Sequence, residues 1–145
     1  MSAAGEEGLA RLAEAFAGVD DEGAARRPAD GGWSPREVLC HLVSSERGTH
    51  DYITQLVGGQ EHWIDEWPGN LEITHAGLLA VFPTPGGLLK ELRRNRSETW
   101  AMLAALPEEF VARKGSYWRL AYGLIEGRIH DDGHLAQIQA ALAVE

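Results

Sequence analysis

The sequence Arg128-Ile129-His130-Asp131-Asp132-Gly133-His134-Leu135-Ala136-Gln137-Ile138 lies near the end of the chain, and its apolar residues recur with the period of an α-helix. His130 and His134 are four residues apart, so on a helix they share a face, with Cβ atoms about 5–6 Å apart. Two imidazoles placed in this way can converge on one metal ion, each nitrogen about 2.0–2.1 Å from it. Histidine pairs at this spacing are also common in helices that bind nothing. The same stripe is lined mostly by small residues, which predicts a hollow beside the histidines: Gly123, Gly127, His130, His134, Gln137 and Ala141.

The clearest helix start in the chain is Trp33-Ser34-Pro35-Arg36-Glu37-Val38. Ser34 is the expected N-cap, Pro35 fits the first helical position, and Glu37 completes a capping box. This helix is expected to run to about residue 57, where Gly58 and Gly59 end it. Its apolar face carries His41, at a place where a lone histidine is usually an ordinary buried residue.

The remaining helices follow from the same periodicity. Residues 6–19 predict the first helix, 85–106 the third and 118–143 the last, with 20–32, 58–85 and 108–117 as connections. The 58–85 connection is long and can hold a short helix at 73–81. No strand-like alternation of any length occurs. We therefore predict an all-α four-helix bundle formed by residues 1–145 as a single domain.

The composition excludes several classes of function. The 145 residues carry a net charge of −9, which argues against a nucleic-acid-binding surface. No apolar run approaches the roughly 20 residues that span a bilayer, and the acidic N-terminal residues do not resemble a signal peptide. The one cysteine, Cys40, cannot form a disulfide within the chain. The simplest expectation is a cytoplasmic protein without a nucleic-acid or membrane partner.

His41, His130 and His134 all lie on inward stripes of two long helices, which in bundles commonly face one another around a metal. Three neutral imidazoles bind Zn²⁺ or Ni²⁺ and leave one coordination position open. Cys40 points roughly 100° away from His41 around the helix, and Glu37 is engaged in its cap. The pattern therefore predicts an open three-histidine site.

The polar neighbours of this site leave alternatives open. Asp131 or Asp132 can accept a hydrogen bond from an imidazole, or both can be solvated. Ser45, Tyr52 and Gln137 are expected either to line a cavity or to make ordinary buried hydrogen bonds. Three arginines, Arg93, Arg94 and Arg96, predict a solvated face, although Arg96 can also point toward a cleft. His62 and His75 are expected at the surface, and Trp63, Trp67 and Phe82 in a lid, in a dimer contact or over the end of the core.

The segments 33–42 and 130–138, in this order and at this separation, resemble the DinB-like (YfiT-like) family of metal-dependent enzymes. The resemblance implies up-down-down-up helices with a long crossover between the second and third, and it places a metal site on His41, His130 and His134. Members of the family include S-transferases that use mycothiol or bacillithiol, and dimers are common. A branch that includes a mycothiol-dependent isomerase has Glu where this chain has His130, so the sequence disfavours that branch.

Three functions remain open at this point. The first is a transferase in which the ion activates a low-molecular-weight thiol for attack on a small-molecule substrate. The second is a hydrolase in which bound water is the nucleophile. The third is a non-catalytic homodimer, in which the metal stabilises the bundle or the bundle binds a small ligand. The fourth coordination position distinguishes them, because a protein side chain there would favour a structural site.

Overall fold

The computed structural model describes residues 3–60 and 65–143, and within these ranges every regular element is helical. Four helices are long: α1 (Ala3–Ala15), α3 (Pro35–Val57), α5 (Pro85–Ala104) and α7 (Lys114–Leu142). Four are short: α2 (Asp21–Ala25), the 3₁₀ helix η1 (Pro68–Asn70), α4 (Glu72–Val81) and α6 (Glu108–Ala112). The all-α prediction is confirmed for the described residues. None of these helices combines the length and the apolar character that crossing a bilayer requires.

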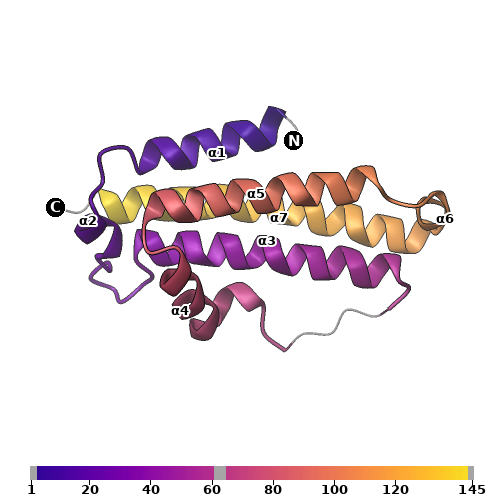
Figure 1. Ribbon diagram of the computed structural model, residues 1–145, viewed down its shortest axis with the longest axis horizontal. Helices are drawn as coiled ribbons and strands as arrows, with labels where there is room; N and C mark the ends of the chain where they lie inside the picture. The colour runs from indigo at the N-terminus through magenta and orange to yellow at the C-terminus, as the bar shows by residue number, and fades with distance from the viewer. Residues whose placement is uncertain (1–2, 61–64, 144–145) are drawn as a thin grey trace.

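The four long helices lie side by side (Figure 1). α3 and α5 run in one direction along the molecule, and α1 and α7 run in the other. α3 contacts α5 and α7, and α1 also contacts α5 and α7. The segment between α3 and α5 is long because both helices begin at the same end of the molecule. Within it, η1 and α4 pack against α3 and return the chain to the start of α5.

The helix starts that the sequence predicts most clearly are those of α3 and α5. The Ser34 side chain accepts a hydrogen bond from the Glu37 amide, and the Glu37 carboxylate accepts one from the Ser34 amide. This capping box satisfies two donors that would otherwise be unpaired, and Pro35 at the first position needs no partner. Thr84 and Pro85 start α5 in a similar way, because the Thr84 hydroxyl accepts from the Gly87 amide.

Several predicted boundaries are wrong. The first helix ends at Ala15 rather than near residue 19, and Gly18 turns the chain with a φ of 78°. Asp20 then caps α2 inside the predicted 20–32 loop. The predicted 108–117 loop holds α6 and the start of α7, which begins four residues before the predicted Trp118. Phe110 of α6 is fully buried and draws this segment onto the core.

Two apolar clusters fill the interior. The larger packs the first half of α3, including Val38, Leu39 and Leu42, against Leu88 and Leu92 of α5 and parts of α1 and α7. The smaller joins four residues at the far end of the molecule: Ile53, Leu56, Phe110 and Leu120. Between the clusters, polar and aromatic side chains of α3 face a cavity. The fold therefore places its candidate site between two packed ends.

Candidate metal centre

The structure brings together the imidazoles of His41 on α3 and of His130 and His134 on α7. The Nε2 atoms of His41 and His130 are 2.8 Å apart, and those of His130 and His134 are 3.0 Å apart. Two nitrogens bound tetrahedrally to one zinc ion lie about 3.3 Å apart, so the observed spacing is close to that of a shared ion. In the described ranges, these three residues form a group that could hold a metal, without a fourth His, Cys, Asp or Glu.

The protonation of His134 shows why three imidazoles in this arrangement fit a cation. His134 donates from Nδ1 to the Gln137 side-chain oxygen at 2.9 Å. A neutral imidazole carries one ring proton, so Nε2 of His134 presents a lone pair. His130 Nε2 contacts both other Nε2 atoms, but one ring nitrogen can make only one good hydrogen bond in its plane. Three lone pairs directed at one cation satisfy all three nitrogens, so the donor set fits a divalent metal.

The surroundings of His41 hold it in the neutral form that a metal requires. His41 is 3 % exposed, and the Trp33 ring lies over it with the centroids 4.9 Å apart. Its pKa is lowered from 6.5 to about 4, mainly by burial and in smaller part by the charges of His134 and His130, against an opposing contribution from the Gly69 backbone. The pKa of His130 is also lowered, first by burial and then by the charge of His134. At neutral pH the imidazoles of His41 and His130 are therefore in their neutral form, in which one ring nitrogen of each has a lone pair that can bind a metal.

The η1 segment closes the site behind His41. A Cβ at Gly69 would lie 2.8 Å from Nδ1 of His41 and 2.5 Å from Oγ of Ser45, so only glycine lets this backbone approach. His75 makes a 2.7 Å hydrogen bond from Nε2 to the Gly69 carbonyl and is buried. The prediction that His75 is a surface residue is therefore wrong. The prediction for His62 falls outside the described residues.

The acidic and basic neighbours pair differently from the simplest expectation. Arg96 is 6 % exposed and lies between Asp131, at 2.5 Å, and Glu46, at 3.5 Å. The prediction that Arg96 is solvated is therefore wrong, and the structure has the alternative, in which Arg96 points toward a cleft. Arg93 and Arg94 are exposed and pair with acidic residues. Cys40 is fully buried in the core, and burial raises the pKa of its thiol to about 12.

The second acidic residue between the histidines, Asp132, faces α1. Its carboxylate pairs with Arg11 at 3.2 Å, and both side chains are largely exposed. The hydrogen-bond acceptor for His134 is instead Gln137. Of the two alternatives that the sequence leaves for Gln137, the hydrogen bond is what the structure has, although the residue is exposed. Gln137 does not line the cavity beside the histidines but a second, smaller hollow, together with Trp33, Glu37 and His75.

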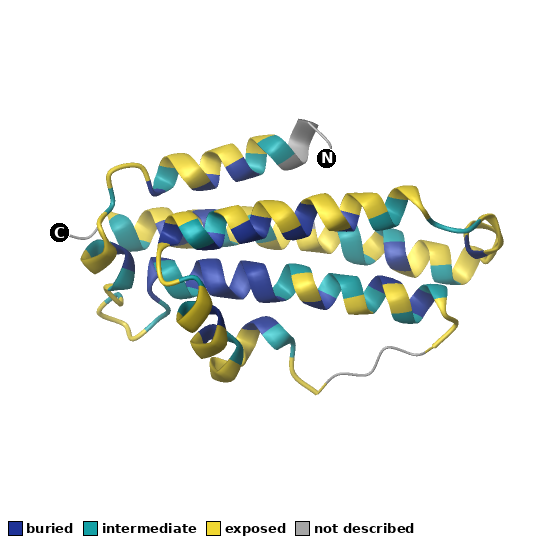
Figure 2. Cartoon of the chain, in the orientation of Figure 1, coloured by how far each residue is buried: buried dark blue, intermediate teal, exposed yellow. Residues whose placement is uncertain are grey.

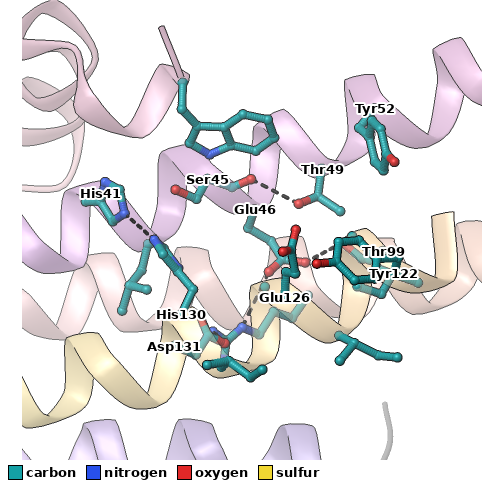
Figure 3. Close-up of a pocket in the computed structure, with 18 of the residues that line it drawn as sticks. His41, Ser45, Glu46, Thr49, Tyr52, Thr99, Tyr122, Glu126, His130 and Asp131 are labelled. Carbon is teal, nitrogen blue, oxygen red and sulfur yellow. Dashed lines mark hydrogen bonds and ion pairs between the residues drawn. The ribbon is translucent and has the colours of Figure 1, made fainter. Parts of the chain in front are cut away.

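A cavity of about 920 Å³ opens beside His41 and His130, between α3, α5 and α7 (Figure 3). Ser45 and Tyr52 line it, as one reading of the sequence predicts. Among the lining residues that the sequence reasoning missed are Trp100, Tyr122, Glu126 and Ile129. Glu126 and Tyr122 lie one and two helical turns before His130, so extending the histidine stripe toward the start of α7 would have found them.

Comparison with known proteins gives one match. A family model described as the DinB superfamily matches residues 4–138, which include all three histidines. The comparison with curated proteins and that with solved structures found no match.

Proposed function

The chain belongs to the DinB superfamily, and on this premise we propose that it is a metal-dependent enzyme. His41, His130 and His134 would hold one Zn²⁺ or Ni²⁺ ion within a four-helix bundle of up-down-down-up order. The observation that carries this proposal is the convergence of three Nε2 atoms. That of His134 presents a lone pair because the ring proton is on Nδ1, which donates a hydrogen bond to the Gln137 side-chain oxygen.

The reaction we propose is the transfer of a low-molecular-weight thiol, such as mycothiol or bacillithiol, to a small electrophile. A divalent ion with an open coordination position supplies Lewis acidity, which lowers the pKa of a thiol or of water. The cavity would hold the electrophile beside His41 and His130. The thiol sulfur bonds to the electrophilic carbon, the thiol proton passes to solvent, and the leaving group departs with its electron pair.

The size of the cavity favours a transferase over a hydrolase. Ligand cavities usually measure about 300–1,000 Å³, so 920 Å³ is at the upper end of that range. This space accommodates two organic substrates, whereas hydrolysis needs one substrate and a water molecule. The lining is mainly apolar and aromatic, which suits an electrophile with an apolar body.

An exposed apolar stripe on α7, part of which borders the cavity, supports a homodimer. Trp118, Tyr122, Ile125 and Ile129 recur at helical spacing, and each is 61–70 % exposed. A stripe of large apolar side chains is costly in water and is typical of an interface. A second copy of the chain would cover it, close to the mouth of the cavity.

The first experiment is metal analysis by mass spectrometry on protein purified without a histidine tag. We expect about one equivalent of zinc or nickel in the wild type and less than about a tenth of that in His134→Ala, with the helical circular dichroism unchanged. His50→Ala is the matched control, because His50 also lies on α3 but bonds to Thr99 and to the Asn95 carbonyl, away from the site. Metal absent from wild type after reconstitution would contradict the proposal.

The choice of nucleophile is tested on cobalt-substituted protein. A small thiol should shift the visible spectrum of the cobalt, because sulfur would enter its coordination sphere. If the metal is bound and the spectrum does not move, the transferase is excluded and hydrolysis becomes the better candidate.

A further inference from the structure

The cavity beside the histidines has two chemically different ends. His41 and His130 form one end, and Glu126 and Tyr122 lie toward the other on α7 (Figure 3). Glu126 precedes His130 by four residues, which is about 6 Å along a helix, and Tyr122 precedes it by eight, about 12 Å. A ligand lying along α7 would therefore present one end to the histidines and the other to Glu126.

Four aromatic side chains line the cavity. Three come from long helices, Tyr52 from α3, Trp100 from α5 and Tyr122 from α7, and the fourth, Trp67, comes from the segment just before η1. Faces of such rings carry partial negative charge and attract ammonium groups, most strongly those of tryptophan. Four rings around one cavity make a favourable environment for an organic cation.

The charges on the cavity wall favour the same class of ligand. Three carboxylates, Glu46, Glu126 and Asp131, line it, against one guanidinium, that of Arg96. Arg96 is already bracketed by Glu46 and Asp131. Glu126 accepts a hydrogen bond from the Tyr122 hydroxyl, a neutral partner, and no ion pair to it occurs among the described side chains. The charged side chains of the cavity wall thus sum to about −2, and among the side chains that the structure describes no Lys or Arg forms an ion pair with Glu126.

We propose that the Glu126 end of the cavity binds an amine or quaternary ammonium group carried on an apolar body. The body would lie along Ile129 and Leu103, and its far end would reach the histidines. Only the identification of this ligand as the electrophilic substrate rests on the proposed function; the binding of the ammonium group does not. A metal ion adds positive charge at the histidine end, which directs the ammonium group to Glu126 and the neutral, reactive end to the ion.

The test is calorimetric titration with three ligands of matched shape: 4-phenylbutylamine, 4-phenylbutanol and 4-phenylbutanoate. The titrations use the protein as purified and are repeated after chelation, because a carboxylate can itself bind a metal. We expect the amine to bind about tenfold more tightly than the alcohol, and the carboxylate to bind most weakly in the chelated protein. Equal affinities for the amine and the alcohol would overturn the proposal, and so would the absence of binding by all three.

Variants locate the ammonium group. Glu126→Gln keeps the shape and an acceptor for Tyr122, so it should bring the affinity of the amine down to that of the alcohol and leave the alcohol unchanged. Glu98→Gln is the matched control, because Glu98 is an exposed α5 carboxylate that pairs with Arg94. Trp100→Leu should weaken the amine more than the alcohol. An amine affinity unaltered by Glu126→Gln would place the cation elsewhere and refute this assignment.

These titrations contain no thiol and measure no turnover. Tight binding of the amine with no thiol-induced shift in the cobalt spectrum would mean that the cavity assignment holds and the transferase does not. The reverse result would leave the transferase in place and exclude the cationic substrate.

Discussion

The first half of α3 and the middle of α7 are both helical, but they contrast sharply in burial (Figure 2). From Val38 to Ser44, every residue of α3 is buried. Among the residues from 117 to 129 of α7 whose burial the structure describes, only Leu120 is buried, and five large apolar or aromatic side chains are exposed. The first segment belongs to the larger core cluster, whereas the second borders the cavity and the exposed stripe.

The difference separates a segment whose side chains, His41 among them, are covered within the chain from one whose side chains are left exposed beside the cavity. α3 begins with a capping box, and its apolar residues find partners on α5, α1 and α7. α7 begins after Arg113 without a side-chain cap, and its apolar residues at 118, 122, 125 and 129 exceed what the core can cover. Such residues have a use only if a ligand, a partner or both cover them.

The largest expected effect is on stability, and it compares Leu39→Ala with Ile129→Ala. Leu39 is fully buried, so its truncation should lower the free energy of unfolding by about 2–5 kcal/mol. Ile129 is 70 % exposed, and its truncation should change that free energy by no more than about 0.5 kcal/mol at low protein concentration. Urea denaturation followed by circular dichroism measures both.

Raising the protein concentration should separate the effects of Leu39→Ala and Ile129→Ala further. If a second copy covers the α7 stripe, the cost of Ile129→Ala should grow as concentration rises, while that of Leu39→Ala should not. Equal costs for the two variants at low concentration would contradict the division between a packed α3 and an open α7.

The next effect is the pH dependence of the metal-free protein. The pKa of His41 is about 4 in the folded protein and close to its ordinary value of 6.5 in the unfolded chain. Between these two pH values the unfolded chain therefore binds a proton that the folded protein does not. The stability should therefore be constant above pH 6.5 and fall as pH drops toward 4, by about 3 kcal/mol in total. Denaturation of wild type and His41→Gln across this range measures the slope, which the variant should reduce. Identical slopes would mean that other groups cause the loss.

The sequence predicts the helices of this fold well wherever local chemistry sets their limits. The capping box at Ser34, the Thr84-Pro85 start and the Gly58-Gly59 end all act within a few residues, so they can be identified without tertiary information. The short helices α2 and α6 could not be predicted in the same way. Phe110 holds α6 against a core that includes Ile53 and Leu56, more than fifty positions away, and periodicity does not report such contacts.

The candidate site is predictable in part for a related reason. The four-residue spacing places His130 and His134 on one face, and the inward stripe of α3 places His41 toward that face; the structure brings all three together. The metal itself stays a prediction. The burial of His75 was missed and that of Arg96 was only an alternative, because each depends on a partner from another element: the Gly69 carbonyl for the histidine and Asp131 for the arginine. The burial of a polar side chain cannot be predicted from the sequence alone when its hydrogen-bond partner comes from a distant part of the chain.

The smallest of these effects concerns how Gln137 positions a ligand without touching the metal. Its side-chain oxygen accepts the Nδ1 proton of His134, which leaves Nε2 free to bind an ion. Gln137→Leu removes that acceptor, so zinc affinity, measured by competition with a chromophoric chelator, should fall about 10–100-fold. Gln137→Glu keeps an acceptor and should restore the affinity, whereas Gln139→Leu, two residues along the same helix, should leave it unchanged. Because the helix is the same in all three variants, a loss confined to Gln137→Leu would locate the effect in the hydrogen bond. An equal loss in Gln139→Leu would mean that the end of α7, rather than the tautomer of His134, governs the metal.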